Sequence, residues 1–150
     1  MKVLILGASG FIGLPVAQAF VRAGHIVYGQ TRSAEKAKLF AAEEIIPVVA
    51  ETENTAAYLS LIATVDAVVD VMGGVNTKTT SALVLSATLD AVKRRRPPSA
   101  AKLVYVYTSG TWVHGDDRKD IITDTTPTAS AQSSSAGGAR RSRRWLRIPR

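Results

Sequence analysis

The sequence contains no cysteine, which excludes disulfide bonds, thiolate zinc sites and a cysteine nucleophile. No cluster of metal-ligating residues stands out either, so we expect no metal site. No apolar run reaches the roughly 18 to 20 residues that a membrane-spanning helix needs. The first residues lead directly into a strand pattern, without the features of a signal peptide. We therefore expect a soluble cytoplasmic protein that does not bind membranes.

The chain has 150 residues, of which 46% are apolar and 21% charged, a composition typical of one globular domain. Its net charge of +7 is concentrated at one end, where six of the 19 basic residues are arginines within residues 140–150. The other thirteen basic residues face 12 acidic ones. Such a tail, with Trp145 within it, is typical either of nucleic-acid binding or of a solvated terminus, and we favour the solvated terminus.

Strand and helix patterns alternate along the chain. A continuous apolar run at residues 3–6 ends in Gly7 and predicts a central parallel strand. The next helix is predicted over residues 11–23, before Gly24, because it has apolar residues at helical spacings: Phe11, Leu14, Val16, Ala17, Phe20 and Val21. Further strands are expected at residues 25–30, 45–49, 67–71 and 102–107, and further helices from an N-cap at Ser33 to residue 42, within 53–63 and at 76–95.

Five strands separated by four helical segments predict a doubly wound α/β fold with a parallel sheet, because each crossover returns the chain in the same direction. Pro47 lies within the third strand and places that strand at a sheet edge. After Asp124 the sequence becomes low in complexity and then basic. We therefore predict one domain over residues 1–124 and a disordered tail over residues 125–150 that adds no sixth strand.

A glycine-rich turn follows the first strand and opens the first helix. Its GxxGxxG spacing consists of Gly7, Ala8, Ser9, Gly10, Phe11, Ile12 and Gly13. In this context the first glycine permits a tight turn, the second lets backbone N–H groups approach a pyrophosphate, and the third lets helix and strand pack closely. We interpret the turn as a dinucleotide-binding site; the alternative is a tight turn without a ligand.

The segment MKVLILGASGFIGLPVAQAFVRAGHIVYGQTRS resembles the amino-terminal part of the short-chain dehydrogenase/reductase superfamily. The resemblance is to its extended and atypical branches, in particular the NAD-dependent epimerase/dehydratase and NmrA-like groups. A second segment, YVYTSGTWVHGD, is similar to the end of the family's fifth strand and the loop that borders the nicotinamide. The resemblance covers residues 1–117 and implies a Rossmann-type NAD(P)-binding fold.

The end of the second strand bears on the choice of cofactor. An acidic side chain there would bind the ribose hydroxyls of NAD, whereas this chain has Arg32 and Ser33 followed by Lys36, which favours NADP. The alternative is that the arginine and the lysine are a solvated surface pair. The resemblance further implies that Glu51 lies near the adenine, unless it is another surface carboxylate, and that the backbone of Met72, Gly73 and Gly74 passes beneath the adenine ribose.

Catalytic residues are harder to assign. The resemblance implies a hydroxyl residue after the fifth strand, for which Thr108, Ser109 and Thr111 are the candidates, and a Tyr-x-x-x-Lys pair on the next helix. No such pair occurs, because Tyr107 is the last tyrosine. His114 is a conceivable acid or base, although a single histidine in a loop is more often structural.

We therefore predict an NADP-binding protein similar to epimerase/dehydratase-type oxidoreductases, without their catalytic half, as a truncated gene model would produce. A non-catalytic, NmrA-like NADP sensor is the first alternative, and a nucleic-acid-associated protein that uses the arginine tail is the second. The expected partner is the dinucleotide cofactor. Neither a small-molecule substrate nor an oligomeric state is indicated.

Overall fold

The computed structural model describes residues 1–110, 121, 123–126 and 146–147. The chain divides into two compact units, one formed by Met1–Val106 with the segment that begins at Leu146, and the other by Tyr107–Trp145. The fold described here is that of the first unit. The domain boundary near residue 125 stays a prediction.

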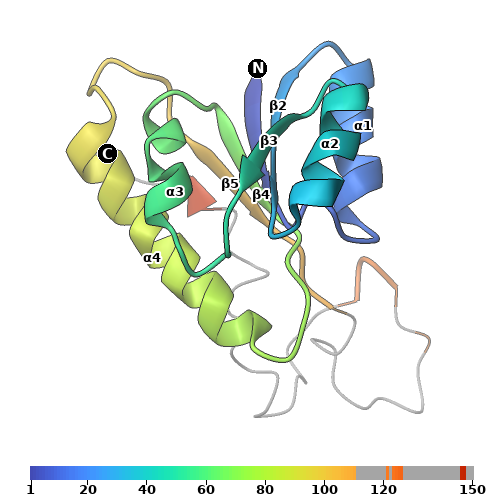
Figure 1. The fold of residues 1–150 in the computed structure, drawn as a ribbon. Coiled ribbons are helices and arrows are strands. Elements are labelled where there is room, and N and C mark those ends of the chain that lie inside the picture. The colour runs from blue at the N-terminus through green and yellow to red at the C-terminus, as the bar shows by residue number, and fades with distance from the viewer. Residues whose placement is uncertain (111–120, 122, 127–145, 148–150) are drawn as a thin grey trace. The chain divides into compact units, whose positions relative to one another are not determined.

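One sheet forms the centre of this unit (Figure 1). Its strands are β1 (Lys2–Leu6), β2 (Ile26–Thr31), β3 (Ile46–Val49), β4 (Ala67–Asp70), β5 (Val104–Tyr107) and β6 (Leu146–Arg147), in the spatial order β3-β2-β1-β4-β5-β6. The strand β1 pairs in parallel with β2 and with β4, and β2 pairs in parallel with β3. The parallel sheet predicted from the alternating pattern is confirmed.

The strand β6 was not expected. It pairs antiparallel with β5, with Leu146 opposite Tyr105 and Arg147 opposite Val104. The prediction that the tail adds no sixth strand is therefore wrong. Pairing at a sheet edge uses backbone N–H and C=O groups, and a strand of two residues is too short to show a side-chain period.

Helices cover both faces of the sheet (Figure 1). Those on one face are α1 (Gly13–Arg22) and α2 (Ala34–Ala42), and those on the other are α3 (Ala56–Leu59), the 3₁₀ turn η1 (Leu61–Ala63) and α4 (Thr77–Arg95). This arrangement confirms the doubly wound fold. Among the described residues, no helix is both long and apolar enough to cross a bilayer.

The core lies between the sheet and these helices. Four consecutive residues of β1, Val3 to Leu6, are fully buried, because helices pack on both sides of the strand. The helix α1 contributes Ala17 to this core. It begins at Gly13 rather than at residue 11, so the prediction that Phe11 belongs to its apolar face is wrong. Phe11 lies in the preceding turn and is 97% exposed.

Three local predictions are confirmed. The Ser33 hydroxyl caps α2 by accepting a hydrogen bond from the Lys36 backbone N–H at 3.3 Å. Gly24 ends α1 with φ of +76°, a conformation that favours glycine. The strand β3, which contains Pro47, is at an edge of the sheet.

Candidate functional site

A cleft with a volume of about 430 Å³ opens at the carboxyl ends of the central strands. The direction of strand order reverses between β1 and β4, and in doubly wound folds ligands bind at that point. The residues that line the cleft come from the end of β2 and from the segments that follow β1, β2, β3 and β4: Gly7, Ser9, Gly10, Gln30, Thr31, Arg32, Lys36, Thr52, Glu53, Val71, Met72, Gly73, Gly74, Val75, Asn76, Thr77 and Thr80.

The glycine-rich turn brings three backbone segments close together. Gly7 has φ of +78°, and a Cβ atom on it would lie 3.2 Å from the Met72 Cα. A Cβ on Gly13 would lie 2.1 Å from the Gly7 carbonyl oxygen. A side chain at position 7 would therefore separate the turn from the end of β4. A side chain at position 13 would separate α1 from β1 and the turn that follows it.

Some backbone N–H groups of the turn already have acceptors. The N–H of Gly7 donates to the Gln30 side chain at 3.0 Å, and that of Gly10 donates to the Gly7 carbonyl at 3.0 Å. Among the described residues, the N–H groups of Phe11, Ile12 and Gly13 donate to no acceptor. They lie at the amino terminus of α1, where N–H groups and the helix dipole favour an anion. A pyrophosphate fits this arrangement.

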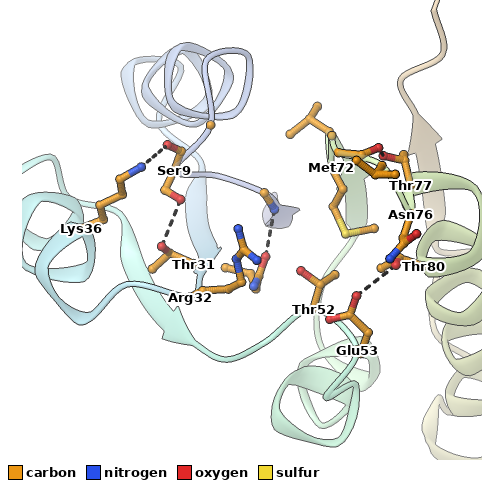
Figure 2. Close-up of a pocket in the computed structure, with 17 residues that line it drawn as sticks. Ser9, Thr31, Arg32, Lys36, Thr52, Glu53, Met72, Asn76, Thr77 and Thr80 are labelled. Carbon is orange, nitrogen blue, oxygen red and sulfur yellow. Dashed lines mark hydrogen bonds between the residues drawn. The ribbon is translucent and has the colours of Figure 1, made fainter.

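Two basic side chains stand beside the turn (Figure 2). Lys36 Nζ donates to the Ser9 carbonyl at 3.3 Å, and Thr31 Oγ1 donates to Ser9 Oγ at 3.0 Å, so the turn is tied to the end of β2. Arg32 Nε lies 4.0 Å from Glu51 Oε2, with the two side chains 73% and 65% exposed. Such an exposed pair is weak, and the guanidinium remains available to an anion.

The opposite wall begins at the end of β4. The Asp70 carboxylate is fully buried and accepts hydrogen bonds from the Met72 N–H at 3.2 Å and from the Tyr105 hydroxyl at 3.0 Å. These bonds fix the start of the segment that continues through Gly73 and Gly74. In Figure 2, Met72 faces the cleft across from Arg32.

The segment after β3 closes the lower side of the cleft in Figure 2. Glu53 accepts a hydrogen bond from Thr80 Oγ1 at 3.0 Å, and the Tyr58 hydroxyl donates to the Thr52 carbonyl at 2.6 Å. Burial raises the pKa of Tyr58 far above its usual range, and the charges of Asp70 and Glu53 raise it further. The phenol therefore stays protonated and keeps its bond to this segment.

The structure places many of the predicted cofactor residues at one cleft. Those that line it are Gly7, Ser9, Gly10, Arg32, Lys36, Met72, Gly73 and Gly74. The others lie beside it, since Ala8 is buried under the turn, Phe11, Ile12 and Gly13 lead into α1, Ser33 caps α2, and Glu51 faces Arg32. Whether each contacts a cofactor stays a prediction.

Other cleft residues were missed by the sequence analysis. They are Gln30, Thr52, Glu53, Val71, Val75, Asn76, Thr77 and Thr80. Thr31, which also lines the cleft, is the last residue of β2 and precedes Arg32. Position at the carboxyl end of a predicted strand was the available signal for Gln30 and Val71, and position in the segment after one was the signal for Thr52. The others are brought to the cleft by the course of two loops and of α4, which no local pattern shows.

The predicted catalytic residues belong to a different part of the chain. Thr108 and Ser109 are in the second compact unit, and their catalytic role stays a prediction. His114 and Thr111 lie outside the described residues, as do all the tail arginines except Arg147. Within the part of the chain that the structure describes, no group of three or more acidic or histidine residues is arranged to hold a metal ion.

A family model described as NAD(P)H-binding matches residues 7–131 of the chain. No curated protein is significantly similar to this chain in sequence. The match includes the glycine-rich turn and every residue of the cleft.

Solved structures of nucleotide-dependent enzymes share the fold. UDP-glucose-4-epimerase from Stenotrophomonas maltophila, with bound NAD, aligns with 83% of this chain and 41% of its own at 19% identity and a TM-score of 0.66. The UDP-glucose 4-epimerase from Bifidobacterium longum, in complex with NAD⁺ and UDP, aligns with 87% of this chain and 43% of its own at 17% identity and a TM-score of 0.66.

A third structure is the binary complex of leucoanthocyanidin reductase with NADPH from Vitis vinifera. It aligns with 61% of this chain and 30% of its own at 27% identity and a TM-score of 0.51. The chain thus spans less than half the length of each of these three proteins. The predicted resemblance to NAD(P)-binding reductases and epimerases is confirmed.

Proposed function

The chain belongs to the NAD(P)H-binding family, and from this premise we propose that it is the cofactor-binding part of an oxidoreductase or epimerase and that it binds NADP in preference to NAD. The observation that carries the preference is the pair of basic side chains at the end of β2. Arg32 and Lys36 both line the cleft, and that strand ends in Thr31 rather than in an acidic residue. A 2′-phosphate there would gain charge-assisted hydrogen bonds.

The pyrophosphate, the adenine ribose and the adenine each have expected neighbours at the cleft or beside it. The N–H groups of Phe11, Ile12 and Gly13 would hold the pyrophosphate. Met72 and the two glycines after it would pass beneath the adenine ribose, with Glu51 near the adenine. When bound, the nicotinamide supplies hydride transfer to or from a small carbonyl or alcohol.

The preference is tested by titrating the chain with NADPH and NADH and following nicotinamide fluorescence. One charge-assisted contact contributes about 1.5 to 3 kcal/mol, which corresponds to about tenfold to a hundredfold in affinity. We expect Arg32→Ala and Lys36→Ala to weaken NADPH binding by up to that factor and to leave NADH binding nearly unchanged.

Lys38→Ala is the matched control, because Lys38 is exposed on α2 and does not line the cleft. It removes the same charge from the same helix and should change neither affinity by more than about twofold, because its side chain does not line the cleft and an exposed charge is screened by water and salt. Equal affinity of the unmutated chain for the two cofactors would refute the preference.

A second candidate is a non-catalytic sensor of NADP, similar to the NmrA-like group. The observation behind it is the cleft itself, which holds the glycine-rich turn and both basic side chains. A sensor needs the cofactor cleft without an acid–base pair. A change in NADP affinity when a protein partner is added would support the sensor, and turnover of any carbonyl compound would support the enzyme.

A further inference from the structure

We propose that Gln30 is a positioning residue that holds the pyrophosphate-binding turn in its binding-competent form by joining the ends of three strands. The inference rests on the proposed function, since it assumes a dinucleotide in the cleft. Gln30 is 1% exposed, lies in β2 and lines the cleft. A buried glutamine in a central strand is unusual, because its amide must find partners for both ends.

Both ends of the amide have partners. The Oε1 atom accepts the Gly7 N–H at 3.0 Å, and Nε2 donates to the Ala50 carbonyl at 2.6 Å. The Gln30 backbone carbonyl also accepts the Ala8 N–H at 3.1 Å. One residue of β2 therefore ties the turn that follows β1 to the segment that follows β3.

Two of these bonds are made to the glycine-rich turn. Gly7 and Ala8 direct their N–H groups toward Gln30, which leaves the N–H groups further along the turn to face a phosphate. Without the side chain, the Gly7 N–H would be free to adopt other orientations. Affinity for an anion at the turn would then fall because the site would have to be ordered on binding.

The neutrality of the amide matters as much as its shape. A carboxylate at this position would accept from Gly7 but could not donate to Ala50, and its negative charge would lie at the cleft where a pyrophosphate binds. A protonated carboxyl group could make both hydrogen bonds, because one oxygen would accept from the Gly7 N–H and the other would donate to the Ala50 carbonyl. Burial raises the pKa of a carboxyl group, so Gln30→Glu converts the position into a pH-dependent one.

The test is calorimetric titration with NADP⁺ and NAD⁺ at pH 5.5 and at pH 8.5, with three variants of the full chain. Gln30→Leu removes both side-chain bonds at similar volume and should weaken the binding of both cofactors by about tenfold or more. Gln30→Glu should bind nearly as well as the unmutated chain at pH 5.5 and at least about tenfold more weakly at pH 8.5.

Two controls separate positioning from stability. Val27 lies in the same strand, is fully buried in the core and does not line the cleft, and Val27→Ala truncates its side chain. It should lower the melting temperature while leaving cofactor affinity within about twofold of the original value. The unmutated chain at both pH values accounts for the titration of the cofactor phosphate. The other charged groups that line the cleft are Arg32, Lys36 and Glu53.

The outcomes are distinct. A Gln30→Leu chain with unchanged affinity, a Gln30→Glu chain without pH dependence beyond that of the unmutated chain, or a Val27→Ala chain weakened as much as Gln30→Leu would overturn the inference. If the unmutated chain binds neither cofactor, the proposed function fails and the inference fails with it.

Discussion

Replacing Gly13 by alanine tests the packing that forms the glycine-rich turn. The added Cβ would lie 2.1 Å from the Gly7 carbonyl oxygen and 2.8 Å from the Ala8 Cα. Both atoms belong to backbone, so no side-chain rotation relieves the contact. The helix α1 must therefore move away from β1, or the turn must change shape.

The expected change in stability has the opposite sign to that of an ordinary glycine-to-alanine substitution in a helix. Gly13 is the first residue of α1, and at an unhindered helical position alanine stabilises relative to glycine by about 0.4 to 1 kcal/mol. Forced overpacking costs about 1 to 3 kcal/mol. We therefore expect a net loss of up to about 2 kcal/mol in the free energy of unfolding.

Urea denaturation followed by circular dichroism measures this change. Gly73→Ala is the control, because no atom lies within 4 Å of a Cβ at Gly73 and its φ is not in the left-handed range. The control should be neutral or slightly stabilising. If Gly13→Ala were as stable as Gly73→Ala, the close approach of α1 to β1 would not hold.

Three further predictions concern other parts of the chain. Tyr58→Phe should lower the free energy of unfolding by about 1 kcal/mol at neutral pH, because the Thr52 carbonyl loses its donor. The pKa of Tyr58 is higher in the folded chain than in the unfolded chain, so the unmutated chain should lose stability above about pH 10, where the unfolded chain ionises. The Tyr58→Phe chain should lose less stability over the same pH range. The chain should oxidise NADPH at no more than a trace rate with a panel of aldehydes, ketones and keto-sugars, since a missing general acid costs about 10² to 10⁴ in rate; robust turnover that disappears in Ser109→Ala or His114→Ala would contradict this. Deleting residues 126–150 should leave the melting temperature almost unchanged, because β6 contributes only two residues; a loss of several degrees would show that this strand and its neighbours stabilise the sheet.

Long, regular elements could be predicted from the sequence because their periods reflect burial. The apolar run after Lys2 predicted a strand covered on both faces, and Val3 to Leu6 are fully buried. The N-cap at Ser33 was found because only a small set of residues fills that role. Phe11 was misplaced because apolar spacing alone does not show where a glycine-rich turn ends and its helix begins.

The cleft could be predicted only where a local motif marks it. The glycine spacing identified the turn, and the basic residues after β2 were found because a known position decides between the cofactors. Gln30 was missed because one glutamine in a strand pattern does not show that its amide bridges Gly7 and Ala50. Thr80 and Glu53 meet through the crossing of two distant segments, which only the folded chain shows.

Binding of the cofactor pyrophosphate by the turn after β1, through the amino terminus of α1, is tested most directly by titrating the ¹⁵N-labelled chain with NADP⁺. The backbone amide signals are followed by nuclear magnetic resonance. We expect the largest shifts at Phe11, Ile12 and Gly13, with smaller shifts at Arg32 and at Met72 to Gly74. Shifts confined to other regions, or none at millimolar cofactor, would contradict it.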